Sequence, residues 1–438
     1  MHLTAVVLFF IHAAALKGLV ISTISMLFFF MANLSKTDLG RNWLNSFTDF
    51  EERKVAAALI DAILLVSRDE LVRSIRDQIE TILNDRSDTA RPIALFAERE
   101  VQKISGVPQP FFPGTESGRA TGVGVAAIGA RPSDKEVGSE GIIANIITEF
   151  ARMQKKNVLS HPGPEEMRSR RISSIVIVAD FIGSGKRMFE MLESFRRVRT
   201  LRSWKSYKII DFKVVSYSAS KIGLNTVCSS KLKPDVYNIV GCPTIYNTFF
   251  GKKLEEIKKI CRKYSKKYTN PFGFLNVGAL IAFAHGIPNN APQILHSTRS
   301  GWTPLFRGRG TAMIEFSFPS EAIETVAERA SRLLPMFNAN CFLVNHVGSQ
   351  WIKTMVVLAA IEGGARSASD ISACTGLHLS CVDEILNNTQ IAHWTDDRNV
   401  LTTLGKQELA SLRRRRRRAP ILPKLESKNY YPTQLRAR

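Results

Sequence analysis

An acidic residue, two glycines and a serine follow a short apolar segment, and together these residue types can bind a phosphate group. Residues 175–178 are apolar and mostly β-branched, which is typical of a buried parallel strand. Asp180 lies at the end of this segment, and Gly183, Ser184 and Gly185 follow before a helical pattern begins. Glycines let backbone N–H groups converge, and the start of a helix favours negative charge. The segment therefore predicts an anion site in which Asp180 accepts hydrogen bonds from sugar hydroxyls beside the phosphate.

A Walker-type nucleotide loop is excluded at two positions. That loop needs glycine at position 180 and Ser or Thr after Lys186, where this chain has Asp180 and Arg187. The remaining pattern resembles the phosphoribosyl-pyrophosphate loop of phosphoribosyltransferases, in which an apolar strand is followed by two acidic residues, two spacers and a small-residue phosphate cradle. The chain departs from that loop at Ala179, where the first acidic residue is expected, and at Arg187, where a hydroxyl is usual. An ordinary strand–turn–helix, with Asp180 as a cap, is the alternative.

The resemblance implies a role for each residue of the loop. Asp180 would be the catalytic residue and would hold the ribose hydroxyls during attack at C1 of the ribose. Mg²⁺ would bind together with a phosphoribosyl-pyrophosphate-like ligand and stabilise the departing phosphate, with no metal site formed by the protein alone. Because Ala179 replaces the first acid, the resemblance leaves enzymatic turnover open. The implied ligand-binding residues are Gly183, Ser184, Gly185, Lys186 and Arg187.

The chain carries a large excess of positive charge. Its 438 residues are 45% hydrophobic and 23% charged, a composition of folded rather than disordered proteins. Lys and Arg number 60 against 39 Asp and Glu, a formal net charge of +21. This excess favours a polyanionic partner, above all nucleic acid, over basic faces that only contact solvent. Part of it lies in residues 413–438, and part in Arg168, Arg170, Arg171, Arg187, Arg196, Arg197, Arg199 and Arg202.

The cysteines and the N-terminal segment bear on the compartment. The six cysteines form no C-x-x-C pair, so neither a zinc site nor a disulfide framework is predicted, and a reducing cytoplasm is expected. Residues 1–33 are mostly apolar, with Lys17 between two runs of about fifteen residues, and lack the basic start of a signal peptide. A membrane span needs about 20 apolar residues, and Lys17 would be costly in its middle. We therefore expect translation to start at Met31, with a membrane anchor as the alternative.

The surrounding elements predict a parallel α/β sheet. Apolar residues recur at helical spacing from 43 to 83, which predicts a helical cap over residues 34–110. Strands are expected at 122–129, 175–179 and 212–217, with a shorter one at 236–240, in a domain of residues 111–320. Strands that alternate with helices favour a parallel sheet with its ligand at the carboxyl ends. This fold class is also that of phosphoribosyltransferases.

Two further segments are expected beside the ligand. By the same resemblance, Arg131 and Lys135, in the polar loop after the first strand, would hold a pyrophosphate; a solvated loop is the alternative. Residues 278–307 combine a proline–asparagine turn with aromatic and basic side chains, which indicates a hood over the site. Ordinary core packing of its rings is the alternative. The hood residues are Asn289, Asn290, Trp302 and Arg307.

After a connecting segment, 321–349, the pattern changes to a winged helix-turn-helix over residues 350–412. Helices are expected at 351–361, 367–374 and 378–386, and two wing strands at 392–395 and 400–404. The expected recognition helix carries Asp383 and Glu384, so docking to protein competes with reading a DNA groove. A basic tail follows over 413–438, and its run of like charges should be extended and contact phosphates without sequence selectivity. The run consists of Arg413, Arg414, Arg415, Arg416, Arg417 and Arg418.

The motifs D-F-x-G-S-G, H-G-x-P-N-N and G-W-x-P-L-F-R occur together in this chain. The combination resembles the divergent phosphoribosyltransferase-like proteins of prokaryotic defence systems, labelled PRTase-CE, over residues 40–310. Fusion to a winged helix is similar to the effectors of certain retrons, which implies an anti-phage role in complex with a reverse transcriptase and its branched RNA–DNA. One alternative is a transcriptional regulator that senses a phosphoribosyl ligand and binds an operator. Another is a binding protein without turnover.

Overall fold

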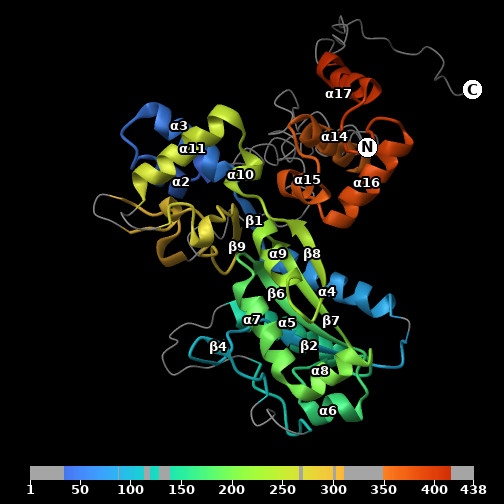
Figure 1. Cartoon of the computed structure of the whole chain (residues 1–438). Helices are drawn as coiled ribbons and strands as arrows, with labels where there is room; N and C mark the ends of the chain where they lie inside the picture. Colours follow the sequence, from blue (N-terminus) through green and yellow to red (C-terminus); the bar gives the residue numbers. More distant parts are fainter. Residues whose placement is uncertain are drawn as a thin grey trace, which may run out of the picture.

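The computed structural model describes residues 34–86, 88–112, 119–127, 139–265, 270–298, 302–309 and 349–415. Figure 1 shows a strand-rich unit, a helical unit beside it, and a C-terminal helical module. No helix within these ranges is long and apolar enough to cross a membrane. The expected segment 1–33 lies outside them.

The central sheet has five strands, all parallel, in the order β5-β2-β6-β7-β8. β5 lies outside β2, whereas β7 and β8 follow on the far side of β6, so the direction in which the chain adds strands reverses between β2 and β6. In open parallel sheets, ligands bind at the carboxyl ends of the strands where this reversal occurs. The strands are β2 (Ile93–Ala97), β5 (Val158–Ser160), β6 (Ser174–Ile182), β7 (Asp211–Ala219) and β8 (Asp235–Gly241).

Helices cover both faces of this sheet because successive strand residues point to opposite sides. In β2, Ile93, Leu95 and Ala97 join one hydrophobic cluster, whereas Ala94 and Phe96 join another. The first cluster contains α4 (Arg68–Asn84) and α5 (Ser139–Met153). The second contains α6 (Pro164–Ser169), α7 (Lys186–Arg197), α8 (Arg199–Ser206) and α9 (Lys221–Cys228). The prediction of a parallel α/β fold is confirmed.

The expected first strand of this sheet is wrong. Residues 122–127 form no strand, and its place is taken by β2, within the range expected to be a helical cap. A Cβ on Gly124 would lie 2.3 Å from the carbonyl oxygen of His161, because this segment packs directly on the loop around Gly163. The small residues at 122–127 thus serve close backbone packing instead of a strand ladder. The other expected strands lie within β6, β7 and β8.

Residues 34–110 are not one helical cap either. Their first helices, α2 (Asp38–Leu44) and α3 (Phe50–Asp61), form a second core with α11 (Gly251–Tyr264) and with parts of residues 272–306. Residues 64–66, expected to be helical, are a strand: β1 (Leu64–Val66) pairs in parallel with β9 (Ile281–Phe283). Because β-branched and leucine side chains suit either structure, only this distant partner decides it. The N-terminal helices and the hood therefore form one unit.

Short elements complete these two units. An antiparallel hairpin joins β3 (Lys103–Ile104) to β4 (Val107–Pro108). One α-helical turn, α10 (Ile245–Thr248), follows β8. The 3-10 helices are η1 (Leu34–Lys36), η2 (Phe274–Asn276), η3 (Gln293–Leu295) and η4 (Arg307–Arg309).

The C-terminal module has the three expected helices, one further helix and a shorter wing. The helices are α14 (Ser349–Glu362), α15 (Ala368–Thr375), α16 (Leu379–Ile391) and α17 (Thr403–Arg415). The wing is a single antiparallel bridge between Thr395 and Leu401, and the second wing strand expected up to residue 404 is wrong because α17 begins at Thr403. Arg413, Arg414 and Arg415 lie in α17 and not in an extended run, whereas Arg416, Arg417 and Arg418 lie outside the described residues.

This module packs on the edge of the sheet through α15. The backbone N–H of Gly241, the last residue of β8, donates to Ser372 Oγ at 2.9 Å. His378, the N-cap of α16, contacts Glu70 of α4, with 3.1 Å between Nε2 and Oε1, and this hydrogen bond lowers the pKa of the Glu70 carboxyl. An edge strand left open is a site for unwanted pairing, and α15 covers β8.

Gly241→Ala should loosen this contact, because its Cβ would lie 2.2 Å from the carbonyl oxygen of Ser369. Such overpacking costs about 1–3 kcal/mol. We expect faster amide hydrogen exchange in residues 368–375 and a lower thermal midpoint. Gly363→Ala is the control, since its Cβ would meet nothing closer than 3.3 Å. Equal exchange in the two variants would contradict docking through Gly241.

Candidate functional site

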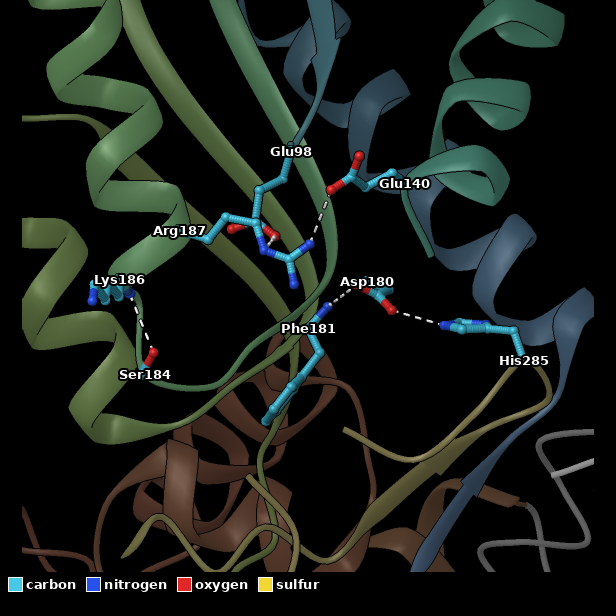
Figure 2. A network of polar contacts seen from close by, with 8 residues as sticks. All are labelled: Glu98, Glu140, Asp180, Phe181, Ser184, Lys186, Arg187 and His285. Atoms are coloured by element: carbon cyan, nitrogen blue, oxygen red, sulfur yellow. Dashed lines mark hydrogen bonds and ion pairs between the residues drawn. The ribbon is translucent and has the colours of Figure 1, made fainter. Parts of the chain in front are cut away.

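The carboxyl ends of β2 and β6 bring the candidate site together where the strand order reverses. β6 continues into the predicted loop, while β2 is followed by Glu98, whose N–H donates to the carbonyl of Val178 at 2.8 Å. Figure 2 shows the polar side chains that meet here, from β6, α5, α7, the loop between β6 and α7, and the residues just after β2 and β9. The prediction that the 180–187 loop lies at the carboxyl edge of the sheet is thus confirmed.

The glycines of the loop are required by close contacts on both sides. A Cβ on Gly183 would lie 1.9 Å from Asn290 Oδ1, so the hood side chain rests directly on the loop. Gly185 has a φ of +74°, and a Cβ there would lie 2.5 Å from the carbonyl oxygen of Gly223 in α9. Neither position can hold a larger residue without moving its neighbours. The loop is therefore fixed between the hood and α9.

Asp180 is held by one contact on each carboxylate oxygen. Its Oδ1 accepts a hydrogen bond from the N–H of Phe181 at 2.8 Å, and its Oδ2 lies 2.8 Å from His285 Nε2 (Figure 2). The His285 ring in turn stacks on Phe283 of β9, with ring centroids 5.2 Å apart. The stack and the carboxylate fix the orientation of the imidazole, and a neutral ring with its proton on Nε2 would donate it to Asp180.

Arg187 lies among carboxylates. Its Nη1 is 3.2 Å from Glu140 Oε1 and its Nε is 3.9 Å from Glu98 Oε2 (Figure 2). Glu98 chiefly raises the pKa of the guanidinium. Burial raises the pKa of the Glu98 carboxyl to about 7, although Arg187 opposes that shift. The predicted contact of Arg187 with a phosphate stays a prediction, and such a phosphate would compete with these two acids.

Ser184 precedes α7, and Lys186 is the first residue of this helix. The N–H of Lys186 points to Ser184 Oγ at 3.4 Å, and no side chain caps the helix at Gly185. The Lys186 side chain is exposed. Backbone N–H groups at an uncapped helix start, beside a lysine, are suited to an anion.

The hood residues have different surroundings. Asn290 contacts the loop, and its Nδ2 donates to the carbonyl of Phe274. Asn289 and Arg307 are exposed. Trp302 packs in the second core, where its ring stacks on Tyr264 at 5.1 Å, so the packing alternative is correct for Trp302. Arg131 and Lys135 lie outside the described residues.

Three residues of this site were not predicted from the sequence. His285 belongs to the H-G-x-P-N-N motif, and the motif was the available signal. Glu98 directly follows the apolar run of β2 and would have been found had that run been assigned to the sheet. Glu140, at the start of α5, carried no signal beyond its position in a helix.

Two family sequence models match the chain. One is described as PRTase-CE and matches residues 41–307, and the other is described as wHTH-PRTase associated and matches residues 355–437. No curated protein and no solved structure matches. The first match spans the sheet, the loop and the hood, and the second extends from α14 through most of the basic tail.

Glu98→Gln should change how stability depends on pH. An acid whose pKa rises on folding binds its proton more tightly in the folded state. Its contribution to the free energy of unfolding therefore falls as the pH rises from 4.5, the pKa of the unfolded carboxyl, to about 7. Stability should therefore fall over this interval in the wild type, by at most about 1.4 kcal/mol per pH unit, and less in Glu98→Gln. Urea unfolding at pH 5 and pH 7 measures this change in the free energy of unfolding for both proteins.

Glu255→Gln is the control. That carboxyl is exposed and its pKa is lowered by Lys258, so its titration lies below this interval. Parallel pH profiles for wild type and Glu98→Gln would contradict a buried, protonatable Glu98.

Proposed function

Because the chain belongs to the PRTase-CE family, we propose that its 180–187 loop binds a phosphoribosyl ligand. The observation that carries the proposal is the joint position of Asp180 and the uncapped start of α7, held between Asn290 and Gly223. The phosphate would lie at the backbone N–H groups that begin α7, with Lys186 beside it. Asp180 would accept hydrogen bonds from the ribose hydroxyls.

Glu98 would supply the acid that Ala179 does not. The Ala179 side chain belongs to the hydrophobic cluster on the α7 side of the sheet, so an acid there would point into apolar surroundings. Glu98, which directly follows the neighbouring strand β2, is close enough to Asp180 for the two charges to interact. These two carboxylates would flank the ligand from adjacent strand ends.

Mg²⁺ fits this arrangement as a companion of the ligand. It is commonly bound by one or two carboxylates together with substrate phosphates, and Asp180 and Glu98 are the acids at hand. Within the described residues, no group of three or more His, Cys, Asp or Glu could hold a metal without a ligand. When bound, the ion would neutralise charge on a departing pyrophosphate.

In the cell, we assign the chain to retron-type anti-phage defence, as a phosphoribosyltransferase-like effector that associates with a reverse transcriptase and its branched RNA–DNA. The fusion of a PRTase-CE domain to its associated winged helix supports this assignment. We place it in the cytoplasm, in keeping with a cysteine spacing that forms no C-x-x-C pair.

A ligand-sensing operator-binding regulator is the less favoured function. α15, the first helix of the helix-turn-helix, is packed on β8 and is not open to a DNA backbone. The exposed face of α16 presents Asp383 and Glu384, which repel phosphates. Both features suit a helix-turn-helix that binds protein.

Ligand binding can be tested by isothermal titration with phosphoribosyl pyrophosphate and Mg²⁺. An Asp180→Ala, Ser184→Ala double variant should bind about 10- to 100-fold more weakly, since a hydrogen bond to a charged group contributes about 1.5–3 kcal/mol. Asp180→Asn keeps an acceptor for the Phe181 N–H and serves to check folding.

The matched control is Asp397→Ala with Ser380→Ala, two exposed residues of the C-terminal module. Equal binding by the wild type and the loop double variant would refute the site. Absence of any ligand-dependent stabilisation in the wild type would favour a binding protein without this ligand.

We also propose that the arginine run 413–418 contacts phosphates of the bound nucleic acid. Each phosphate contact makes the slope of log affinity against log salt concentration more negative, by about 0.9 on duplex and about 0.7 on single strands. Replacing all six arginines with serine should therefore flatten the slope by several units, equally for unrelated sequences. Fluorescence anisotropy with labelled branched RNA–DNA measures it.

Replacing the same six residues with lysine retains the charge and should retain the slope. If the serine variant kept both affinity and slope, the run would have no part in nucleic-acid binding.

A further inference from the structure

The amino edge of the sheet, opposite the candidate site, is lined by exposed cations. Because all five strands are parallel, the segments that precede them lie side by side at this edge. It faces the lower end of Figure 1, where α6 and α8 are labelled. We name as the amino-edge cations five exposed residues, each two or three positions before a strand: Lys155 and Lys156 before β5, Arg171 before β6, Lys208 before β7 and Lys233 before β8.

Hydrogen bonds hold these segments together. The Arg91 side chain, just before β2, donates to the carbonyl of Arg171 at 2.9 Å and to that of Ile209 at 2.6 Å. Arg170 donates to the carbonyl of Lys156 at 3.2 Å. Neighbouring strands lie about 4.8 Å apart, so the cations extend over about 19 Å across five strands.

Three of these cations have an unfavourable backbone conformation. Arg171, Lys208 and Lys233 have φ values of 50°, 55° and 47°. Glycine and asparagine adopt this left-handed conformation more readily than other residues. The turns alone would favour those residues, and a cation at all three points to a role for the charge.

The described acids near this edge leave the five cations without ion pairs. Asp211 and Asp235 both bind Lys213, at 3.4 and 3.1 Å. Asp88 accepts from the N–H of Ala90. None of the amino-edge cations forms an ion pair with another residue that the structure describes.

We propose that the amino edge binds the backbone of a single-stranded nucleic acid. A row of separate cations suits successive phosphates, and Tyr207, 77% exposed beside Lys208, can stack on a base. A membrane surface would instead need an amphipathic helix, whereas the exposed apolar groups here are Met153 at the end of α5 and Tyr207 and Ile209 in the connection between α8 and β7.

This surface leaves the phosphoribosyl site open. β6 has nine residues, so its two ends lie about 26 Å apart, and a nucleic-acid strand bound at the amino edge does not cover the 180–187 loop. The inference extends the nucleic-acid association proposed above but does not depend on the ligand or on the arginine run.

The test is a triple variant, Arg171→Asn, Lys208→Asn and Lys233→Asn, in the full chain. Asparagine adopts the left-handed conformation more readily than arginine or lysine, so the thermal midpoint should be equal to or above that of the wild type. Three phosphate contacts should be lost at the same time. For a labelled 20-nucleotide single strand, the slope of log affinity against log salt should fall by about 2, and affinity at 0.1 M salt by about a hundredfold. Fluorescence anisotropy measures both quantities.

Controls separate this surface from net charge and from the arginine run. Lys252→Asn, Lys253→Asn and Lys259→Asn on α11 remove three exposed lysines elsewhere and should leave binding nearly unchanged. Lys155→Gln with Lys156→Gln, which alters no left-handed residue, should weaken binding in the same direction as the triple variant. The same losses are expected in a chain whose residues 413–418 are serine.

Unchanged affinity in the triple variant would overturn the proposal, as would an equal loss in the α11 control. Charge-dependent binding to phosphatidylserine vesicles without binding to the oligonucleotide would also overturn it, in favour of a membrane surface.

Discussion

The candidate site depends on one close contact, between the glycine loop and the hood. Asn290 occupies the space that a side chain at Gly183 would need, and His285 reaches Asp180 from the same unit. Both hood residues are positioned by a core that includes the N-terminal helices and by the pairing of β1 with β9. The orientation of the Asp180 carboxylate thus depends on packing far from the loop. A substitution in that second core would therefore change the contacts that Asp180 makes with a ligand.

The charges at the two ends of the sheet are paired differently. Asp180, Glu98 and Glu140 gather at the carboxyl edge, where the strand order reverses, around Arg187. The segments that enter the strands at the amino edge carry cations without carboxylate partners among the described residues. Composition alone gives a net charge of +21 but not this division. It arises because parallel strands collect all their entering segments at one edge and all their leaving segments at the other.

Sequence patterns predicted β6, the loop and the C-terminal helices because each is a local signal. The apolar run of β6 ends in an acid and glycines, and Ser367, a good N-cap, begins α15. The predictions that failed concern residues whose contact partners are distant in the sequence. Nothing local distinguishes Leu64–Val66 as a strand, because its partner is β9, and nothing local shows that His285 meets Asp180. Gly124 lies in a strand-like run, yet its contact with His161 is visible only in three dimensions.

The position of the C-terminal module follows from an exposed strand edge. β8 ends the sheet, and α15 covers it where Gly241 meets Ser372. Gly241 is at the carboxyl end of β8, so the module lies on the same edge as the ligand loop, two strands away from β6. Continuous hydrogen-bonded ladders from β6 through β7 to β8 join the two places. In this arrangement the first helix of the helix-turn-helix, α15, packs on the sheet. α16 therefore does not need to enter a DNA groove, and its exposed face can carry acidic residues.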